Sequence, residues 1–313
     1  MEYEDGTVDK VELGRRFGKA SGAVYPHNVV TNLKEGDSVS PGTAIAYNEG
    51  FFTPDSLNPG EVIWKAGVMC KTALLESSDT FEDSSAISEK IAKKLATDVT
   101  HVRHIFLDFE REIRNLVEVG DTVDAETPLC LIEDSVTADN DLFDEDTLDT
   151  LRMLSSNAPR AKWPGKVERI EVLYYGDKED MSESLKHVTE QSDRDRARRA
   201  RALGEKATTG AVDDSIRIDA KVLDIDSLVI KVYITEEEGA GTGDKGVFGN
   251  QMKTIFARVM SGTNETESGE EVDALFAMTS ISNRIINSPM VMGTTNTLLR
   301  VLSKHAAKVY KEG

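Results

Sequence analysis

Residues 243–253 read GDKGVFGNQMK, and this stretch gives the strongest indication of how the chain folds. Its glycines free the backbone for tight turns, and Lys245 and Lys253 stand at either end of the loop. Small residues admit an anion close to the backbone and ammonium groups neutralise it, so the segment suits phosphate binding. It is not a P-loop, because no Gly-Lys-Ser/Thr sequence follows at the required spacing. Considered alone, it is more typical of an ordinary glycine loop.

Strand-like segments flank the loop on both sides. Residues 228–234, LVIKVYI, predict a strand before the loop, following a shorter one at 222–225. Residues 255–259 and 272–277 predict two further strands after it. An amphipathic helix is predicted at 294–310. Its apolar face consists of Leu298, Leu299, Val301 and Leu302.

Two short β modules are indicated in the first half of the chain. After Val29-Val30, residues 35–46 read EGDSVSPGTAIA, in which two turns precede an apolar strand at 43–46. A second version occupies residues 119–132, VGDTVDAETPLCLI. Both resemble a half-motif of barrel–sandwich hybrid folds, as in biotinyl and lipoyl carriers. Neither copy has a lysine at a hairpin tip, so a swinging-arm function is rejected.

The remaining segments are polar or amphipathic. Ile87, Ile91 and Leu95 recur every four residues and predict a short helix over 84–95, capped by a serine or by Asp83. The acidic stretch from Glu133 to Asp149 predicts a surface excursion. Residues 178–204 are almost wholly polar. They end in an arginine-rich run at 194–201, which favours a solvated helix or flexible tip over a contact with nucleic acid or a partner protein.

Together with the strand before it, the loop resembles the β subunit of multi-subunit DNA-dependent RNA polymerases. There, Gly-Asp-Lys is followed by a variable stretch and then by Gly-Asn-Lys or Gly-Gln-Lys, with the same lysine spacing. Residues 79–84, DTFEDS, leading into Ile87-Ser88-Glu89, resemble the family's Asn-Phe-Glu-Asp-Ser followed by Ser-Glu. Residues 272–275 and 281–285 resemble its Val-Asp-Ile-Val strand and Val-Pro-Ser-Arg-Met. These motifs occur in the family's order and cover most of the chain.

The sequence departs from the family's pattern in the loop itself. The family has Arg-His before its Gly-Asn or Gly-Gln, whereas Gly249-Asn250 stands at that place here. Thr254 replaces the glycine after the second lysine, and Asp79-Thr80 replaces the aromatic-Asn pair before Phe81. The correspondence is therefore firmer for Lys245 than for Lys253.

The resemblance implies a mainly β fold with some α structure. Its parts are a double-psi β-barrel, an inserted flap or wall, and an N-terminal barrel–sandwich hybrid segment. Residues 1–58 match the hybrid segment and 59–108 the first half of the barrel. Residues 109–212 match the flap, with the acidic excursion and the arginine-rich tip. Residues 213–313 match the second half of the barrel and a C-terminal helix.

The same resemblance assigns roles to five residues. Lys245 and Lys253 would face the growing RNA end and nearby phosphates, Glu82 and Asp83 would lie near a second Mg²⁺, and Arg284 would point at the nucleotide triphosphate. The catalytic Mg²⁺ would be held mainly by a β′-like partner with a three-aspartate loop. In nucleotidyl transfer, negative charge develops on phosphate oxygens between two metal ions, and lysines and arginine stabilise it.

Each of these residues also has a structural interpretation. Glu82 and Asp83 could cap the predicted helix, Arg284 could pair with a carboxylate, and the two lysines could be ordinary surface residues.

The histidine pair and the cysteine pair of the sequence are both interpreted as structural. His101 and His104 are three residues apart, a spacing that binds metal on a helix, but no third ligand is evident. Cys70 and Cys130 fit no zinc motif or disulfide framework and are interpreted as buried apolar residues.

These observations predict a β-like, C-terminal-half fragment of a split RNA polymerase of the kind found in large bacteriophages, active as an enzyme only within the multi-subunit complex. Its partners would be a β′-like subunit, the remaining β-like fragments and other polymerase subunits, together with the DNA template, nascent RNA and nucleoside triphosphates. It would function in the cytoplasm of the infected host cell or be packaged in the virion. The alternative is a non-catalytic scaffold or decoy module of a polymerase assembly.

Composition is compatible with a subunit and unfavourable for a free-standing nucleic-acid binder. Aspartate and glutamate number 56 against 37 lysines and arginines, which gives a formal net charge of −19 over 313 residues. Duplex affinity depends on cations that neutralise phosphates, so this charge restricts any such contact to a few placed residues. No apolar run approaches the roughly 20 residues that span a bilayer, and the first thirty residues lack the apolar core of a signal peptide. A soluble intracellular protein with no membrane contact is expected.

Overall fold

The computed structural model describes residues 1–20, 22–65, 67–133, 158–249, 251–284 and 287–312. The protein is 37% strand and 22% helix, which confirms the predicted mainly β class with some α structure. The acidic excursion after Glu133 lies outside the described residues. Within them, every helix is too short or too polar to cross a bilayer.

The chain forms two compact units, each assembled from two separate segments. The first unit contains Met1–Lys65 and Asp98–Glu237, and the second contains Ala66–Thr97 and Glu238–Gly313. Relative to the predicted boundaries, residues 59–65, 98–108 and 213–237 fall in the first unit.

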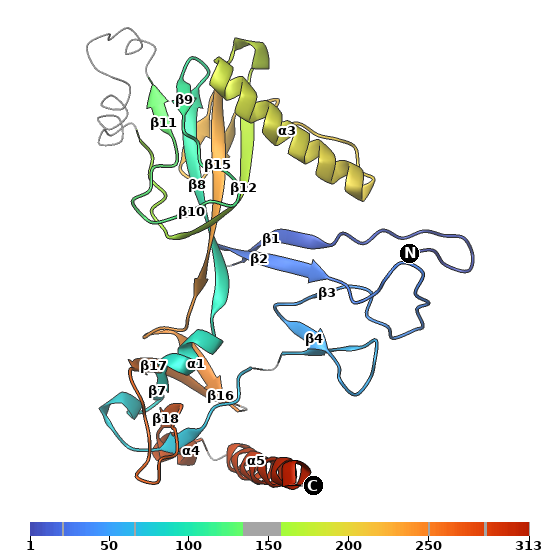
Figure 1. Ribbon diagram of the computed structural model, residues 1–313. Coiled ribbons are helices and arrows are strands. Elements are labelled where there is room, and N and C mark those ends of the chain that lie inside the picture. The colour runs from blue at the N-terminus through green and yellow to red at the C-terminus, as the bar shows by residue number, and fades with distance from the viewer. Residues whose placement is uncertain (21, 66, 134–157, 250, 285–286, 313) are drawn as a thin grey trace. The chain divides into compact units, whose positions relative to one another are not determined.

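A seven-stranded sheet is the main element of the first unit (Figure 1). Its strand order is β1-β2-β8-β15-β12-β10, with β3 paired to β2. The strands are β1 (Gly14–Ala20), β2 (Ala23–Val30), β3 (Tyr47–Asn48), β8 (Thr97–Asp108), β10 (Thr122–Val123), β12 (Gly165–Tyr175) and β15 (Ser227–Glu238). Three two-stranded sheets accompany it: β4 (Phe52–Pro54) with β5 (Val62–Trp64), β9 (Glu112–Arg114) with β11 (Leu131–Glu133), and β13 (Ile216–Ile218) with β14 (Lys221–Leu223).

The strand predicted at 228–234 is confirmed within β15, whereas the one predicted at 43–46 is wrong. Residues 43–46 form no strand, because the amide of Ala44 bonds to the carbonyl of Gly60 outside the sheet, and β3 begins only at Tyr47.

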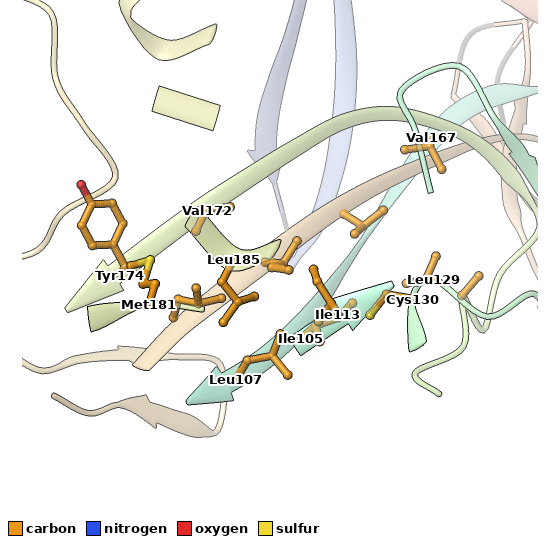
Figure 2. Packing of buried hydrophobic residues seen from close by; sticks show 14 of the residues in the cluster. Ile105, Leu107, Ile113, Leu129, Cys130, Val167, Val172, Tyr174, Met181 and Leu185 are labelled. Carbon is orange, nitrogen blue, oxygen red and sulfur yellow. The ribbon is translucent and has the colours of Figure 1, made fainter. Parts of the chain in front are cut away.

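The core of the first unit follows from the alternation of side chains along β15. Residues at every second position of a strand share a face, and Leu228, Ile230, Val232 and Ile234 are all buried there. Figure 2 shows that side chains of the other strands pack into the same layer, together with Met181 and Leu185. Cys130 is buried in this cluster, and burial raises the pKa of its thiol to about 12.

The polar segment after residue 178 folds as helix α3 (Glu183–Leu203), not as a flexible tip. Ser182 caps its start by accepting a hydrogen bond from the Leu185 amide, and Gly204 ends it with a positive φ of 71°. The helix is not simply solvated, because Leu185 and Thr189 are fully buried on its inner side. Polar residues can occupy that side because they have hydrogen-bond partners: Thr189 donates to Met181 Sδ at 3.6 Å, and Ser192 bonds to the sheet.

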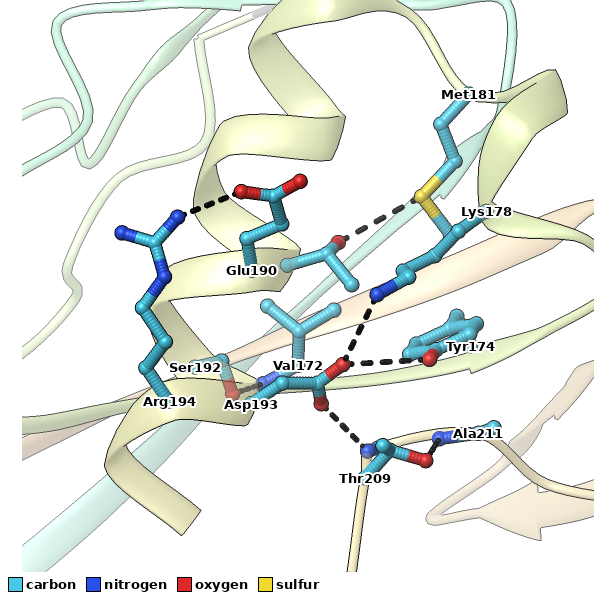
Figure 3. Close-up of polar contacts among 12 residues, drawn as sticks. Val172, Tyr174, Lys178, Met181, Glu190, Ser192, Asp193, Arg194, Thr209 and Ala211 are labelled. Carbon is cyan, nitrogen blue, oxygen red and sulfur yellow. Dashed lines mark hydrogen bonds and ion pairs between the residues drawn. The ribbon is translucent and has the colours of Figure 1, made fainter. Parts of the chain in front are cut away.

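Hydrogen bonds from side chains of α3 satisfy backbone groups along one edge of β12, as Figure 3 shows in part. Ser192 Oγ accepts a hydrogen bond from the Val172 amide at 2.9 Å, and Arg196 donates to the Val172 carbonyl at 3.3 Å. The Asp193 carboxylate accepts hydrogen bonds from the Gly210 amide at 2.7 Å and from the Tyr174 hydroxyl at 3.3 Å. Part of the arginine-rich run therefore has a structural role.

The second unit is built around a five-stranded sheet of order β16-β17-β7-β18-β6. Strand β7 lies between two strands of the other chain segment, parallel to β17 and antiparallel to β18. The strands are β6 (Thr72–Leu74), β7 (Ser84–Ser88), β16 (Lys245–Phe248), β17 (Met252–Met260) and β18 (Ala274–Phe276). The helices are α1 (Glu89–Lys94), α4 (Met278–Ser282) and α5 (Ser288–Glu312).

The helix predicted over 84–95 is wrong in its first half. Residues 84–88 form strand β7, and α1 begins only at Glu89, with Ser88 Oγ accepting a hydrogen bond from the Ile91 amide at 3.3 Å. Because β7 is a central strand, consecutive residues from Ser85 to Ser88 are buried on both faces. The helix predicted at 294–310 is confirmed within α5, where the predicted apolar face is exposed: Leu298, Leu299, Val301 and Leu302.

Candidate functional site

The glycine loop of the sequence forms a β-hairpin in the second unit. Strands β16 and β17 pair antiparallel, with Lys245 opposite Ile255 and Val247 opposite Lys253. Directly opposed residues and residues two apart share a face, so both lysines lie on the same exposed face of the hairpin. Such diagonal neighbours lie about 7–8 Å apart, close enough for both ammonium groups to contact one anion.

The hairpin's other face packs into the unit and explains one of the glycines. Phe248 lies against Phe276 with ring centroids 5.1 Å apart, and Met252 is buried beside them. A Cβ at Gly246 would lie 2.3 Å from the ring of Phe256, so no larger residue fits there without a shift. This glycine is required by packing, not by an approaching phosphate.

Arg284 holds the beginning of β17 in place. Its guanidinium donates to the carbonyl of Gln251 at 2.7 Å and to the carbonyl of Lys253 at 2.9 Å. It also forms an ion pair with Asp83 at 2.5 Å. The alternative that Arg284 pairs with a carboxylate is therefore confirmed, and its expected contact with a triphosphate stays a prediction.

Glu82 and Asp83 lie in the turn that precedes β7, with their side chains exposed. Glu82 has a positive φ of 51°, and its carbonyl accepts a hydrogen bond from the buried Ser280 hydroxyl. The carbonyl of Asp83 accepts from the Ile255 amide at 2.9 Å. The alternative that these residues cap a helix at Ser84 is wrong, because that segment is a strand.

The five predicted residues thus belong to one unit, and most of them are connected. The lysines share a face of the hairpin, while Arg284 links Asp83 to the backbone of Lys253. No contact joins the Glu82 carboxylate to the other four among the described residues.

Sequence reasoning missed the polar residues that support this site. Thr254, noted only as a departure from the family's glycine, is buried and donates to Ser85 Oγ at 2.8 Å between β17 and β7. Alternation along residues 252–260 could have placed it on the buried face with Met252 and Phe256. Gln251 acts through its backbone carbonyl, and Ser280 donates to the carbonyl of Glu82, which lies 198 positions earlier in the chain. The sequence carries no signal for either contact.

The histidines do not form a metal pair. His101 and His104 lie on strand β8, where residues three apart point to opposite faces. His101 stacks on Trp163 with centroids 4.4 Å apart and contacts Glu236 at 2.9 Å, whereas His104 contacts Asp219 at 2.6 Å. Within the ranges described above, no cluster of three potential metal ligands occurs.

A comparison with models of known protein families gave no match, and a comparison with curated protein sequences gave none either. The resemblance to polymerase β subunits rests on the residues of this chain alone.

The role of Arg284 can be tested by the change Arg284→Lys. A single ammonium cannot replace the fork that reaches two carbonyls and Asp83, and losing charged hydrogen bonds of this kind costs about 1.5–3 kcal/mol. Because the hairpin loses this stabilisation, hydrogen–deuterium exchange of the backbone amides in residues 245–260 should become faster. The matched control is Arg258→Lys, because Arg258 is 62% exposed and pairs with Asp79 at 3.3 Å. Equal exchange in the two variants would show that Arg284 is dispensable for the hairpin.

Proposed function

We propose that the chain is a β-like subunit of a phage-type, multi-subunit DNA-dependent RNA polymerase. The observation that carries the proposal is the placement of Lys245 and Lys253 on one exposed face of the β16–β17 hairpin. The family-like order of motifs along the chain supports it.

The two lysines suit a site that binds RNA-end and nucleotide phosphates. Among the described residues, neither ammonium group has an ion-pair partner, so both are available to an anionic ligand. Charge developing on phosphate oxygens during nucleotidyl transfer is stabilised by such placed cations. Arg284 acts here as a positioning residue, because it binds the carbonyl of Lys253.

Mg²⁺ would be held mainly by a β′-like partner. Mg²⁺ prefers six oxygen ligands in octahedral geometry, and Glu82 and Asp83 together offer only two carboxylates, one of them bound to Arg284. This donor set fits a secondary role near a second Mg²⁺. When bound, the metal would neutralise the developing phosphate charge.

The finer fold assignment belongs to the same proposal. The second unit would be the double-psi barrel, and residues 98–237 between its two segments would contain the flap or wall. Support comes from the sheet, in which strand β7 of the first segment lies between β17 and β18 of the second. Residues 1–58 would be the barrel–sandwich hybrid segment.

The partners would be the remaining β-like fragments and other polymerase subunits, the DNA template, nascent RNA and nucleoside triphosphates. The complex would function in the cytoplasm of an infected host cell or be packaged in the virion. The second candidate is a non-catalytic scaffold or decoy. The ion pair between Arg284 and Asp83 favours it, because each side chain neutralises the charge that the other would offer to a nucleotide or metal.

Reconstitution separates these functions. The chain is co-expressed with β-like and three-aspartate β′-like polypeptides of a phage-type polymerase, and extension of an RNA primer on a DNA template is measured. We expect extension only when this chain is present, and none from the chain alone. Extension that persists in a complex lacking the chain would contradict the proposal, and assembly only with the host β′ subunit would indicate a decoy.

A further inference from the structure

A pocket of about 730 Å³ lies in the first unit, away from the residues used so far. It is bordered by the β1–β2 hairpin, by strands β8 and β15, and by the end of β13. The lining residues important here are Phe17, Lys19, Arg217, Asp219, Lys231 and Tyr233.

Lys231 is one of the cations that line this pocket, and the carboxylate across the strand from it is already bound to other residues. Glu171 lies directly opposite Lys231 in the pairing of β12 with β15. The Glu171 carboxylate contacts Arg169 at 2.5 Å and Arg199 at 3.3 Å, and it accepts a hydrogen bond from the Tyr233 hydroxyl at 3.1 Å. Lys231 itself has no ion-pair partner among the described residues.

The other lining residues make the pocket more positive. Lys19 and Arg217 add two cations, and Asp219 is the only carboxylate among the described lining residues. Asp219 contacts His104 at 2.6 Å. Burial lowers the pKa of the Lys231 amine, the carboxylates of Glu171 and Asp219 oppose this, and the positive charges of Arg196 and Lys19 lower it further. An anion in the pocket would relieve this repulsion.

The pocket also offers an apolar wall. The rings of Phe17 and Tyr233 lie with centroids 5.1 Å apart. Burial raises the pKa of the Tyr233 hydroxyl to about 12, and Glu171 raises it as well, so the ring stays uncharged at neutral pH. Aromatic rings beside cations are a frequent setting for nucleotide phosphates and bases.

We propose that this pocket binds a phosphate-bearing ligand, with Lys231, Lys19 and Arg217 contacting the phosphate oxygens. The ligand would be a nucleotide or a backbone phosphate of single-stranded RNA, since both present the same group. The pocket lies within the first unit, so the proposal does not depend on the function assigned to Lys245 and Lys253.

The test uses the full chain carrying Lys245→Met and Lys253→Met, so that the hairpin lysines contribute no binding. Affinity is measured by titration calorimetry with sodium tripolyphosphate and with UTP, and by anisotropy with a labelled ten-nucleotide RNA. In this background we expect Lys231→Met and Lys19→Met each to weaken binding at least tenfold. Lys166→Met, an exposed lysine of β12 outside the pocket, should change it less than twofold.

The probes distinguish the sources of the phosphate. If UTP binds more tightly than tripolyphosphate, the ligand is a nucleotide. If tripolyphosphate displaces the labelled RNA, the pocket binds a backbone phosphate of RNA. Lys19 is exposed, so Lys19→Met keeps the test valid if Lys231→Met disturbs folding, which thermal unfolding would reveal. The proposal is overturned if no probe binds, or if Lys19→Met binds as tightly as the background protein.

Discussion

Replacing Lys245 and Lys253 together by methionine is expected to slow nucleotide addition by the reconstituted polymerase by about 10²–10³-fold. This is the range found when one placed donor to a developing oxyanion is removed from an active site. The two ammonium groups share an exposed face of the β16–β17 hairpin, so neither change disturbs the packed face beneath. Methionine retains most of the aliphatic length and removes the charge.

The measurement is single-nucleotide addition at saturating nucleotide on an assembled RNA–DNA scaffold. Saturation separates a slower chemical step from weaker nucleotide binding. Lys166→Met serves as the control, because that lysine is exposed on β12 in the other unit. Gel filtration confirms that each variant assembles. Undiminished addition by an assembled double variant would refute the catalytic role and favour a scaffold.

Leu185→Ala is expected to lower the free energy of unfolding of the first unit by about 2–5 kcal/mol. Leu185 is fully buried in the core cluster that Figure 2 shows, although it belongs to the most polar segment of the chain. Its removal would leave a cavity between α3 and the sheet. The expected loss is a large part of the stability of a typical domain.

The matched control is Leu298→Ala on α5. Leu298 is 60% exposed, so the same substitution in a helix should change stability by no more than about 0.5 kcal/mol. Unfolding in urea is monitored by hydrogen–deuterium exchange of the α3 and α5 segments, which measures the change in stability at each helix separately. Equal effects of the two substitutions would contradict the packing of α3 on the sheet.

The strands with the clearest alternation could be predicted from the sequence. Along β15, apolar residues at every second position pack into the core, and residues 255–259 and 272–277 likewise contain strands. These predictions succeeded because the pattern within one segment reports which face is buried.

The first half of the predicted helix at 84–95 failed for a reason that is not local. Ile87 and Ile91 are both buried in one cluster, which imitates a helical face. The strand identity of Ile87 depends on β17 and β18, whose residues lie more than 160 positions later in the chain. A central strand buried on both faces has no alternation by which to recognise it.

At the candidate site, too, the sequence indicated local features and not the contacts between distant residues. The sequence predicted a glycine loop with Lys245 and Lys253 at its ends, whereas these residues form the β16–β17 hairpin, which the sequence did not indicate. The sequence suggested that Arg284 could pair with a carboxylate, but it could not identify Asp83, 201 positions away, as the partner. Nor could it show that Arg284 also binds the carbonyls of Gln251 and Lys253. Backbone acceptors are present at every residue and leave no mark in the sequence.

The bonds that α3 makes to Val172 have a consequence for how copies of the chain behave in solution. A strand edge with unpaired amide and carbonyl groups is a template on which another chain can add a strand. Here, Ser192 and Arg196 occupy the amide and the carbonyl of Val172, so the sheet ends there without needing another strand. The arginine-rich helix thus leaves neither backbone group of Val172 free to pair with a strand of another chain.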